Sequence, residues 1–333
     1  MKYIFWLGAG VSIPSPTSLK DGKTYTLEWL EYLLEKNDFK FISDLFSENS
    51  ELIGKDCPRL EKVIEDAIKV YGSDVLNLLL TFKDRPTNIN HILLSKYIVE
   101  NKSLAFTTNF DDCIEKASIN AIPIHLPNND CTDTWGLVKL HDSILNPSLE
   151  LLGHSIKNLV NGISIGLEQM LIDCLNEKGN TFVFCGYSGQ DFFDIIPFFS
   201  NYSDNQKFEA NIIWIDHSNN VPKDGKSLEQ LERGPRTIIG AFSNYKVVSG
   251  NTTEILEGLC GYSKENYKTI NAEFDFSPEN AFLPPKKLKK LFASQLFATF
   301  GYGAKSFEAV ILSHVRNRES LYLLLNSFMR YST

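Results

Sequence analysis

Two polar side chains stand where apolar segments end, at positions from which they could act on a bound molecule. Asn109 follows the apolar residues 103–107, and His141 follows the alternating residues 136–140. The carboxyl ends of strands line the ligand crevice of open α/β sheets, and an imidazole there could deprotonate a water. A single histidine is more often structural than catalytic, so only its placement distinguishes His141.

Asp111 lies beside Asn109 and allows two interpretations. A helix-like stretch, residues 113–117, follows it directly, so its carboxylate or that of Asp112 could simply cap that helix. Asn109 has no such structural explanation. We therefore place Asn109, Asp111 and His141 in one candidate catalytic group.

A glycine-containing turn follows the first apolar run, residues 2–7. It reads Gly8-Ala9-Gly10-Val11-Ser12. Glycines at a strand-to-helix turn let the backbone approach a phosphate, and free N–H groups at a helix start favour negative charge. The dinucleotide pattern Gly-x-Gly-x-x-Gly is incomplete, because Ile13 occupies its third glycine position. An ordinary tight turn is therefore the alternative.

Two further apolar segments end in residues suited to a nucleotide. One leads into Gly186, Ser188 and Asp191, and the other ends at Asp216, whose carboxylate could bind a ribose hydroxyl. Each such end alone is common in α/β proteins. Five of them in succession favour a nucleotide crevice.

The elements that must position these residues alternate between short apolar runs and helix-like stretches. That alternation predicts a Rossmann-like, doubly wound parallel α/β sheet. The expected strands are residues 2–7, 103–107, 136–141, 181–186, 211–216 and 236–248, the last as one strand or two.

Helical segments accompany this sheet. Residues 20–100 read as a mostly helical insertion within one domain, residues 1–276, that carries the site. Residues 277–333 read as a C-terminal helical segment, either an interaction region or the start of a further domain. Its apolar residues 321–325 need a surface to pack on.

Composition and charge narrow the class of protein. The 333 residues are 43% hydrophobic and 22% charged, as in ordinary globular proteins. The net charge of −8 argues against nucleic-acid binding, and the lysines within 286–290 read as a solvated helix face. The six cysteines lack ligand spacing, so we expect no metal and a reducing, cytoplasmic setting. The apolar residues 1–7 are too short for a membrane span.

Together these motifs resemble the sirtuin-like (silent information regulator two) family. The matching segments, in the family's order, are Gly8-Ala9-Gly10-Val11-Ser12, Thr107-Thr108-Asn109-Phe110-Asp111, Lys139-Leu140-His141 and Gly186-Tyr187-Ser188-x-x-Asp191. The resemblance extends roughly over residues 1–250 and is closest to a divergent bacterial branch of antiviral NAD hydrolases. Arg85-Pro86-Thr87 with His91 also resembles that branch.

The resemblance implies cleavage of NAD, as a substrate, to nicotinamide and ADP-ribose by an NAD-depleting effector of anti-phage defence. Asn109 and Asp111 would hold the nicotinamide ribose and the attacking water, and His141 would be the general base. The residues that would bind NAD are Gly8, Ala9, Gly10, Ser12, Thr108, Gly186, Ser188, Asp191 and Asp216. Of these, the first four would hold the phosphates, and the last three would face the adenosine half.

Departures from the family pattern bear on the reaction. The protein deacylases carry four zinc-binding cysteines after the histidine, whereas here that interval holds only Cys174 and Cys185, which disfavours deacylation. The family's glycine after the histidine is Asp142, and residues 15–20 replace its Gly-Ile-Pro-x-Phe-Arg stretch. Both changes alter the acceptor and nicotinamide sides.

Two alternative functions stay open. The same crevice could serve an NAD-dependent ADP-ribosyl transferase or a deacylase. A non-catalytic subunit that binds NAD or ADP-ribose is the second, although a pure binder would not need both Asn109 and His141. A constitutive NAD hydrolase would drain its own cell, so we expect activity to need a homo-oligomer or a partner protein, contacted through the C-terminal helices.

Overall fold

The structure, a computed structural model, describes residues 2–48, 58–118, 120–127, 133–152, 162–191, 194–203, 207–269, 274 and 276–301. Its contacts divide the chain into two compact units. The sheet unit consists of Met1–Asp21 and Leu79–Phe276, and the helical unit consists of Gly22–Leu78 and Ser277–Thr333. The chain therefore leaves the sheet unit, returns to it and leaves it again.

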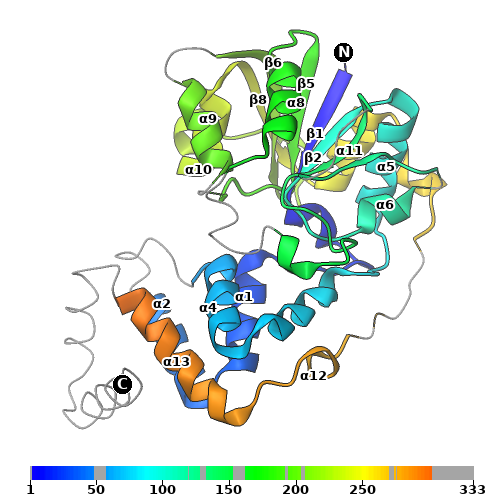
Figure 1. Cartoon of the computed structure of the whole chain (residues 1–333). Coiled ribbons are helices and arrows are strands. Elements are labelled where there is room, and N and C mark those ends of the chain that lie inside the picture. Colours follow the sequence, from blue (N-terminus) through cyan, green and yellow to red (C-terminus); the bar gives the residue numbers. More distant parts are fainter. Residues whose placement is uncertain are drawn as a thin grey trace. The chain divides into compact units, whose positions relative to one another are not determined.

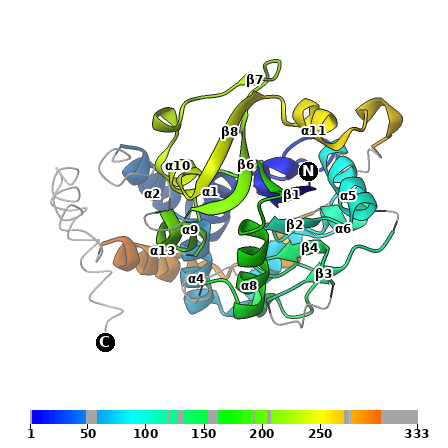
Figure 2. The ribbon, with the colours of Figure 1, turned by 90° about the horizontal axis from the view of Figure 1, so that it is seen from above.

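The sheet unit contains an eight-stranded, mainly parallel sheet within the described residues, in the order β3-β4-β2-β1-β5-β6-β8-β7. The strands are β1 (Lys2–Leu7), β2 (Leu104–Thr107), β3 (Ile124–His125), β4 (Gly136–Lys139), β5 (Asn180–Cys185), β6 (Phe208–His217), β7 (Lys223–Asp224) and β8 (Phe242–Gly250). Without the two-residue strands β3 and β7, this is the 3-2-1-4-5-6 order of a Rossmann-like fold, which confirms the predicted fold class. The order reverses between β1 and β5. Figure 2 shows β2 and β4 on one side of β1, and β6 and β8 on the other.

Two apolar cores enclose the sheet, because successive residues of each strand point to opposite faces. Ile4 and Trp6 of β1 belong to the first core, and Phe5 and Leu7 belong to the second. In the first core the Trp6 ring stacks on Phe184, with ring centroids 5.2 Å apart. Burial on both faces explains why residues 4–7 of β1 and 182–185 of β5 are continuously apolar.

Helices cover both faces of the sheet. Those in the first core are α8 (Ile165–Leu175), α9 (Ile195–Ser203) and α10 (Arg233–Gly240). Those in the second core are α5 (Ile89–Asn101), α6 (Cys113–Ala117) and α11 (Thr252–Cys260). The connection after β1 ends in α5 on one face, whereas β5 is followed by α9 on the other. A crevice at this switch point is the usual ligand site of such sheets.

The helical unit combines helices from two distant parts of the chain (Figure 1). They are α1 (Gly22–Leu33), α2 (Lys36–Glu48), α4 (Leu60–Tyr71), α12 (Pro278–Ala281) and α13 (Lys286–Gly301). Nζ of Lys289 in α13 donates to the Tyr32 carbonyl at 2.9 Å, which satisfies a carbonyl at the end of α1. Phe292 of α13 is fully buried, so the C-terminal helix belongs to the core of this unit.

Short 3-10 helices occupy several connections. They are η1 (Ala9–Ser12), η2 (Ser73–Phe82), η3 (Leu149–Leu151), η4 (Leu228–Gln230) and η5 (Lys264–Asn266). No helix in the described part of the chain has the length and apolar character needed to cross a bilayer.

One predicted strand is wrong in its first part. Residues 236–248 were expected to be extended, but α10 runs to Gly240 and β8 begins at Phe242. Pro235 lies in the first turn of α10, where proline is tolerated, and the helix buries Ile238 and Ile239. An apolar pair beside a strand cannot by itself distinguish helix from strand.

The segments predicted to be helical are mainly helical among the described residues, but they are divided differently between the two units. α5 lies within the predicted insertion 20–100 but packs on the sheet, so the inserted helices of the helical unit end before Leu79. The helix expected over 286–299 is confirmed by α13. The one expected over 304–330, with the apolar residues 321–325, lies outside the described residues.

Candidate functional site

The site residues predicted from the sequence lie at or beyond the ends of five adjacent parallel strands, β4, β2, β1, β5 and β6. Thr107 of β2 pairs with Lys139 of β4, and Asn109 and His141 each lie two residues beyond that pair. Asn109 and His141 therefore stand at the same edge of the sheet, just beyond neighbouring strands.

The turn after β1 packs directly against the turn after β5. The Gly8 N–H donates to the Cys185 carbonyl at 3.0 Å, and the Gly10 N–H donates to the Gly186 carbonyl at 2.8 Å. A Cβ on Gly10 would lie 2.7 Å from the Gly186 Cα, and Gly186 has a φ of +61°. The contact between the two turns thus requires glycine. It also occupies the Gly10 N–H, which was expected to be a free donor for phosphate.

A pocket of about 620 Å³ adjoins these glycines. Its lining includes Gly10, Gly186, Ser188 and Asp216 of the predicted set, with an aromatic wall that contains Trp214. The volume falls within the range of roughly 300–1,000 Å³ typical of small-molecule pockets. The candidate residues at the ends of β2 and β4 do not belong to this lining.

Asp216 occupies the end of β6 with its carboxylate held in place. Its Oδ2 accepts a hydrogen bond from Ser249 Oγ and forms an ion pair with Lys226 Nζ, each at 3.1 Å. The side chain is 28% exposed, so a ligand in the pocket can reach it. The sequence analysis missed Lys226, because it belongs to a polar loop without strand or helix pattern.

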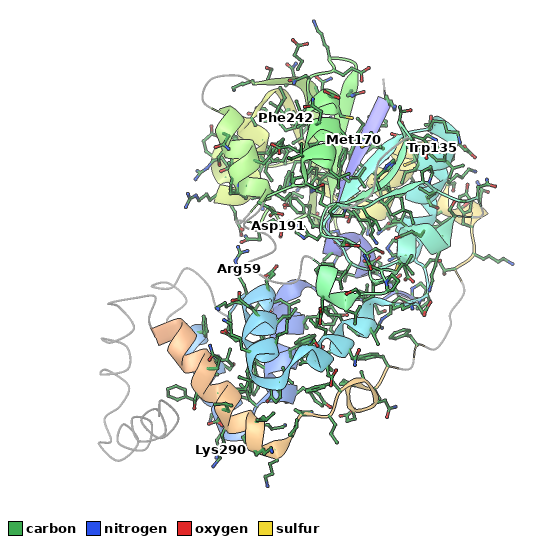
Figure 3. The ribbon with its side chains drawn as sticks, viewed as in Figure 1. Arg59, Trp135, Met170, Asp191, Phe242 and Lys290 are labelled. Carbon is green, nitrogen blue, oxygen red and sulfur yellow. The ribbon has the colours of Figure 1, made fainter. Side chains whose placement is uncertain are left out.

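Asp191 lies in the loop between β5 and α9 (Figure 3). The Tyr187 hydroxyl donates to its Oδ2 at 2.7 Å, and Tyr187 lines the pocket. Ser188 is exposed beside them. Asp191 therefore bears on the pocket by fixing the tyrosine in its wall.

Ser12, His91 and Asp111 form a buried hydrogen-bonded chain next to the glycine turn. Ser12 Oγ lies 3.0 Å from Nε2 of His91 and donates to Oδ2 of Asp111 at 3.1 Å. The Asn88 N–H donates to Nδ1 of His91 at 3.2 Å, so the neutral ring carries its proton on Nε2 and donates it to Ser12. Burial lowers the pKa of His91 to about 4, against the opposing effect of the Asp111 carboxylate.

Protein donors engage both carboxylate oxygens of Asp111. Oδ2 accepts the bond from Ser12, and Oδ1 accepts the Cys113 N–H at 3.1 Å, where α6 begins. This geometry favours the helix-start interpretation of Asp111. Asn109, by contrast, is half-buried, and its backbone N–H donates to Thr107 Oγ1 at 3.0 Å, which fixes the turn after β2.

His91, Asp111 and Cys113 offer three potential metal ligands, whose donor atoms all lie within 4.8 Å of one another. A cysteine binds a metal as the thiolate. Burial, reinforced by the Asp111 carboxylate, raises the pKa of Cys113 far above its usual range, so the thiol keeps its proton at neutral pH. Because Ser12 already joins His91 to Asp111, hydrogen bonding explains this cluster better than a metal does.

His141 is buried in the turn after β4 and pairs with a residue that the sequence analysis missed. Its Nε2 lies 2.6 Å from Oδ2 of the buried Asp194. Asp194 directly precedes α9, and its Oδ1 accepts the Ile195 N–H at 2.8 Å. An aspartate before a helix reads as a cap, so nothing in the sequence indicates that its second oxygen binds a histidine.

No protein-family model matches the chain, and no curated protein is significantly similar to it. We therefore propose a function from the strand-end geometry, together with the motif resemblance.

Proposed function

We propose that this chain is a sirtuin-like NAD glycohydrolase, which cleaves NAD to nicotinamide and ADP-ribose and depletes NAD in bacterial anti-phage defence. One observation carries the proposal. A pocket beside the close-packed glycine turns of β1 and β5 adjoins a sheet edge where Asn109 and His141 follow neighbouring strands. Dinucleotides bind across a switch point in this way.

The two halves of NAD fit the two parts of this edge. The pocket would take the adenosine half, with the Asp216 carboxylate accepting hydrogen bonds from ribose hydroxyls. The pyrophosphate would lie over the turn that contains Gly10. The nicotinamide ribose would then extend towards Asn109 and His141. Asn109 and His141 lie outside the pocket lining, so this placement requires a ligand that extends beyond the pocket.

The reaction needs few protein groups. The bond between the ribose C1′ and the nicotinamide nitrogen breaks, and its electron pair neutralises the pyridinium ring, so the leaving group needs no acid. A water oxygen bonds to C1′ and loses a proton to a base. The transition state carries positive charge on the sugar, which the Asn109 amide oxygen would stabilise. A positioned base contributes about 10²–10⁴ in rate.

His141 is the candidate base, and its contact with Asp194 indicates which ring nitrogen would accept the proton. A carboxylate at Nε2 accepts the proton on that nitrogen, so the basic atom of the neutral ring is Nδ1. Asp194 would also stabilise the imidazolium that forms when His141 takes the proton from water. The base acts on the water directly or through a ribose hydroxyl.

Incubation of the purified chain with NAD, followed by separation of nicotinamide, ADP-ribose and cyclic products, tests the proposal. We expect nicotinamide and ADP-ribose in equal amounts, and none from His141→Ala. We also expect turnover to rise with protein concentration or with a partner, as assembly through the C-terminal helices requires. Binding of NAD without cleavage, from dilute to concentrated protein, would instead identify a regulatory subunit. Transfer of ADP-ribose to a protein would identify a transferase.

A further inference from the structure

Lys139 is a buried cation that none of the proposed chemistry uses. It is the last residue of β4, and its side chain is 1% exposed. A lysine is rarely buried this completely unless its ammonium group is paired and hydrogen-bonded. The contacts of its ammonium group therefore indicate the role of Lys139.

The ammonium group binds the turn that carries Asn109. Nζ of Lys139 donates to the carbonyl of Asp111 and lies 3.4 Å from the carbonyl of Phe110. It also lies 3.5 Å from Ser143 Oγ, in the turn that carries His141. One side chain thus contacts both turns.

A backbone bond reinforces the same junction. The Ile144 N–H donates to the Phe110 carbonyl at 3.0 Å, so that carbonyl accepts from Ile144 and lies close to Lys139. Hydrogen bonds from charged donors are stronger than those from neutral ones. The Lys139 ammonium therefore adds a charged donor to the backbone link between the two turns.

Glu115 of α6 supplies the counter-charge. Its Oε1 lies 2.9 Å from Nζ of Lys139, and the Glu115 side chain is 9% exposed. Burial raises the pKa of Glu115, while Lys139 acts against that rise. A buried ion pair seldom stabilises a fold more than apolar residues of similar size would, so stability alone does not account for it.

We propose that Lys139 is a positioning residue, which holds the Asn109 turn and the His141 turn in the relative placement that catalysis needs. Glu115 orients the ammonium group through its 2.9 Å contact with Nζ. This inference depends on the proposed NAD hydrolysis for its kinetic consequence, but the placement of the turns can be measured without it. Displacement of a reacting group by about 1 Å can lower a rate by about 10²-fold.

The test separates positioning from stability by removing both charges together. Lys139→Met alone leaves the Glu115 carboxylate buried without its charged partner and should lower the melting temperature. Lys139→Met with Glu115→Met replaces the pair by apolar side chains and should restore it. We expect this double variant to keep NAD affinity, measured by calorimetry, within about threefold, and to lose about 10²-fold in kcat.

Two controls match these changes. Lys246→Met removes an exposed lysine of β8 that pairs with the exposed Asp224, and should alter neither property. Leu171→Ala removes a buried side chain of α8 in the first core, and should lower the melting temperature while kcat is retained. A double variant with wild-type kcat would overturn the proposal.

Hydrogen exchange gives a readout that does not require activity. In the double variant the Asn109 and Ile144 amides, which donate to Thr107 Oγ1 and to the Phe110 carbonyl, should exchange faster than in the wild type, while the amides of β5 stay protected. Unchanged exchange at these two amides would refute the positioning role, whatever the enzyme does. If these amides exchange faster in the double variant but the wild-type protein does not hydrolyse NAD, the proposed function is refuted. The role of Lys139 in holding the two turns is then retained.

Discussion

Nε2 of His141 lies 2.6 Å from Oδ2 of Asp194, and both side chains are buried. Asp194→Asn keeps the shape of the side chain but lets its amide donate to Nε2, which moves the ring proton to Nδ1 and removes the base. We expect a loss in kcat within the range of about 10²–10⁴, with little change in NAD affinity. Steady-state kinetics with calorimetry measure both. Asp173→Asn, on the exposed face of α8, is the control, and an unimpaired Asp194→Asn enzyme would exclude the pairing from catalysis.

Substitution of His141 or Asn109 should affect the reaction, whereas substitution of Gly10 should affect NAD binding. His141→Ala should abolish hydrolysis and leave NAD affinity within a small factor, because its interaction is made mainly in the transition state. Asn109→Ala should act similarly, with some loss of affinity if the amide touches ribose. Gly10→Val should weaken binding, since its side chain would meet the Gly186 backbone and separate the two turns. The inverse pattern, with His141→Ala still hydrolysing NAD, would require another mechanism.

The buried His91 should make stability depend on pH. Its folded-state pKa of about 4 lies below the ordinary 6.5, so between these values the unfolded chain binds a proton that the folded chain does not. The free energy of unfolding should therefore fall by about 3 kcal/mol as the pH drops from about 6.5 to about 4. Urea unfolding at several pH values measures this slope. His91→Gln should lack this contribution, and an equal slope in both proteins would contradict it.

The left-handed backbone conformation of Asp142 should lower the free energy of unfolding. It has a φ of +69°, and its Oδ1 accepts the Ser143 N–H at 2.7 Å. Asp142→Ala and Asp142→Gly both remove that bond, but only alanine keeps a Cβ in the left-handed region. We expect the free energy of unfolding of the alanine variant to be about 1–2 kcal/mol lower than that of the glycine variant. Equal stability in denaturant titrations would show that the turn relaxes.

Zinc should be absent from the His91, Asp111 and Cys113 cluster in the purified protein, because Ser12 already joins His91 to Asp111 and both Asp111 oxygens accept hydrogen bonds from the protein. Elemental analysis after purification without chelator measures this directly. Prolonged treatment with EDTA should leave the melting temperature unchanged. Stoichiometric zinc, lost on chelation together with stability, would show that this cluster is a metal site.

The strand ends could be predicted because each is encoded locally. An apolar run that stops at Gly8, Asn109 or Gly186 indicates both a buried strand and its exposed end, and parallel strands bring such ends to one edge. The strand predicted from residue 236 failed for the same reason, since the buried Ile238 and Ile239 resemble a strand in a short window. Local pattern thus predicts a buried segment better than it predicts the segment's type.

The partners of the site residues could not be predicted, because they are set by tertiary packing. Asp194 is 53 residues from His141, and His91 is 79 residues from Ser12. Both Asp194 and Asp111 look like helix caps in the sequence, and both do accept the N–H at a helix start. Their second oxygens bind His141 and Ser12, which no local pattern indicates.

The discontinuous helical unit has a consequence for synthesis on the ribosome. α4 ends at Tyr71, but α13, which contributes the buried Phe292, begins about 200 residues later. At roughly 5–20 residues per second, the nascent α1, α2 and α4 would wait about 10–40 s for that helix. The sheet unit is complete once Phe276 has emerged, so it can fold first. A nascent chain from which residue 276 but not residue 286 has emerged would therefore carry a folded sheet and three helices with an exposed apolar face, a natural substrate for chaperones.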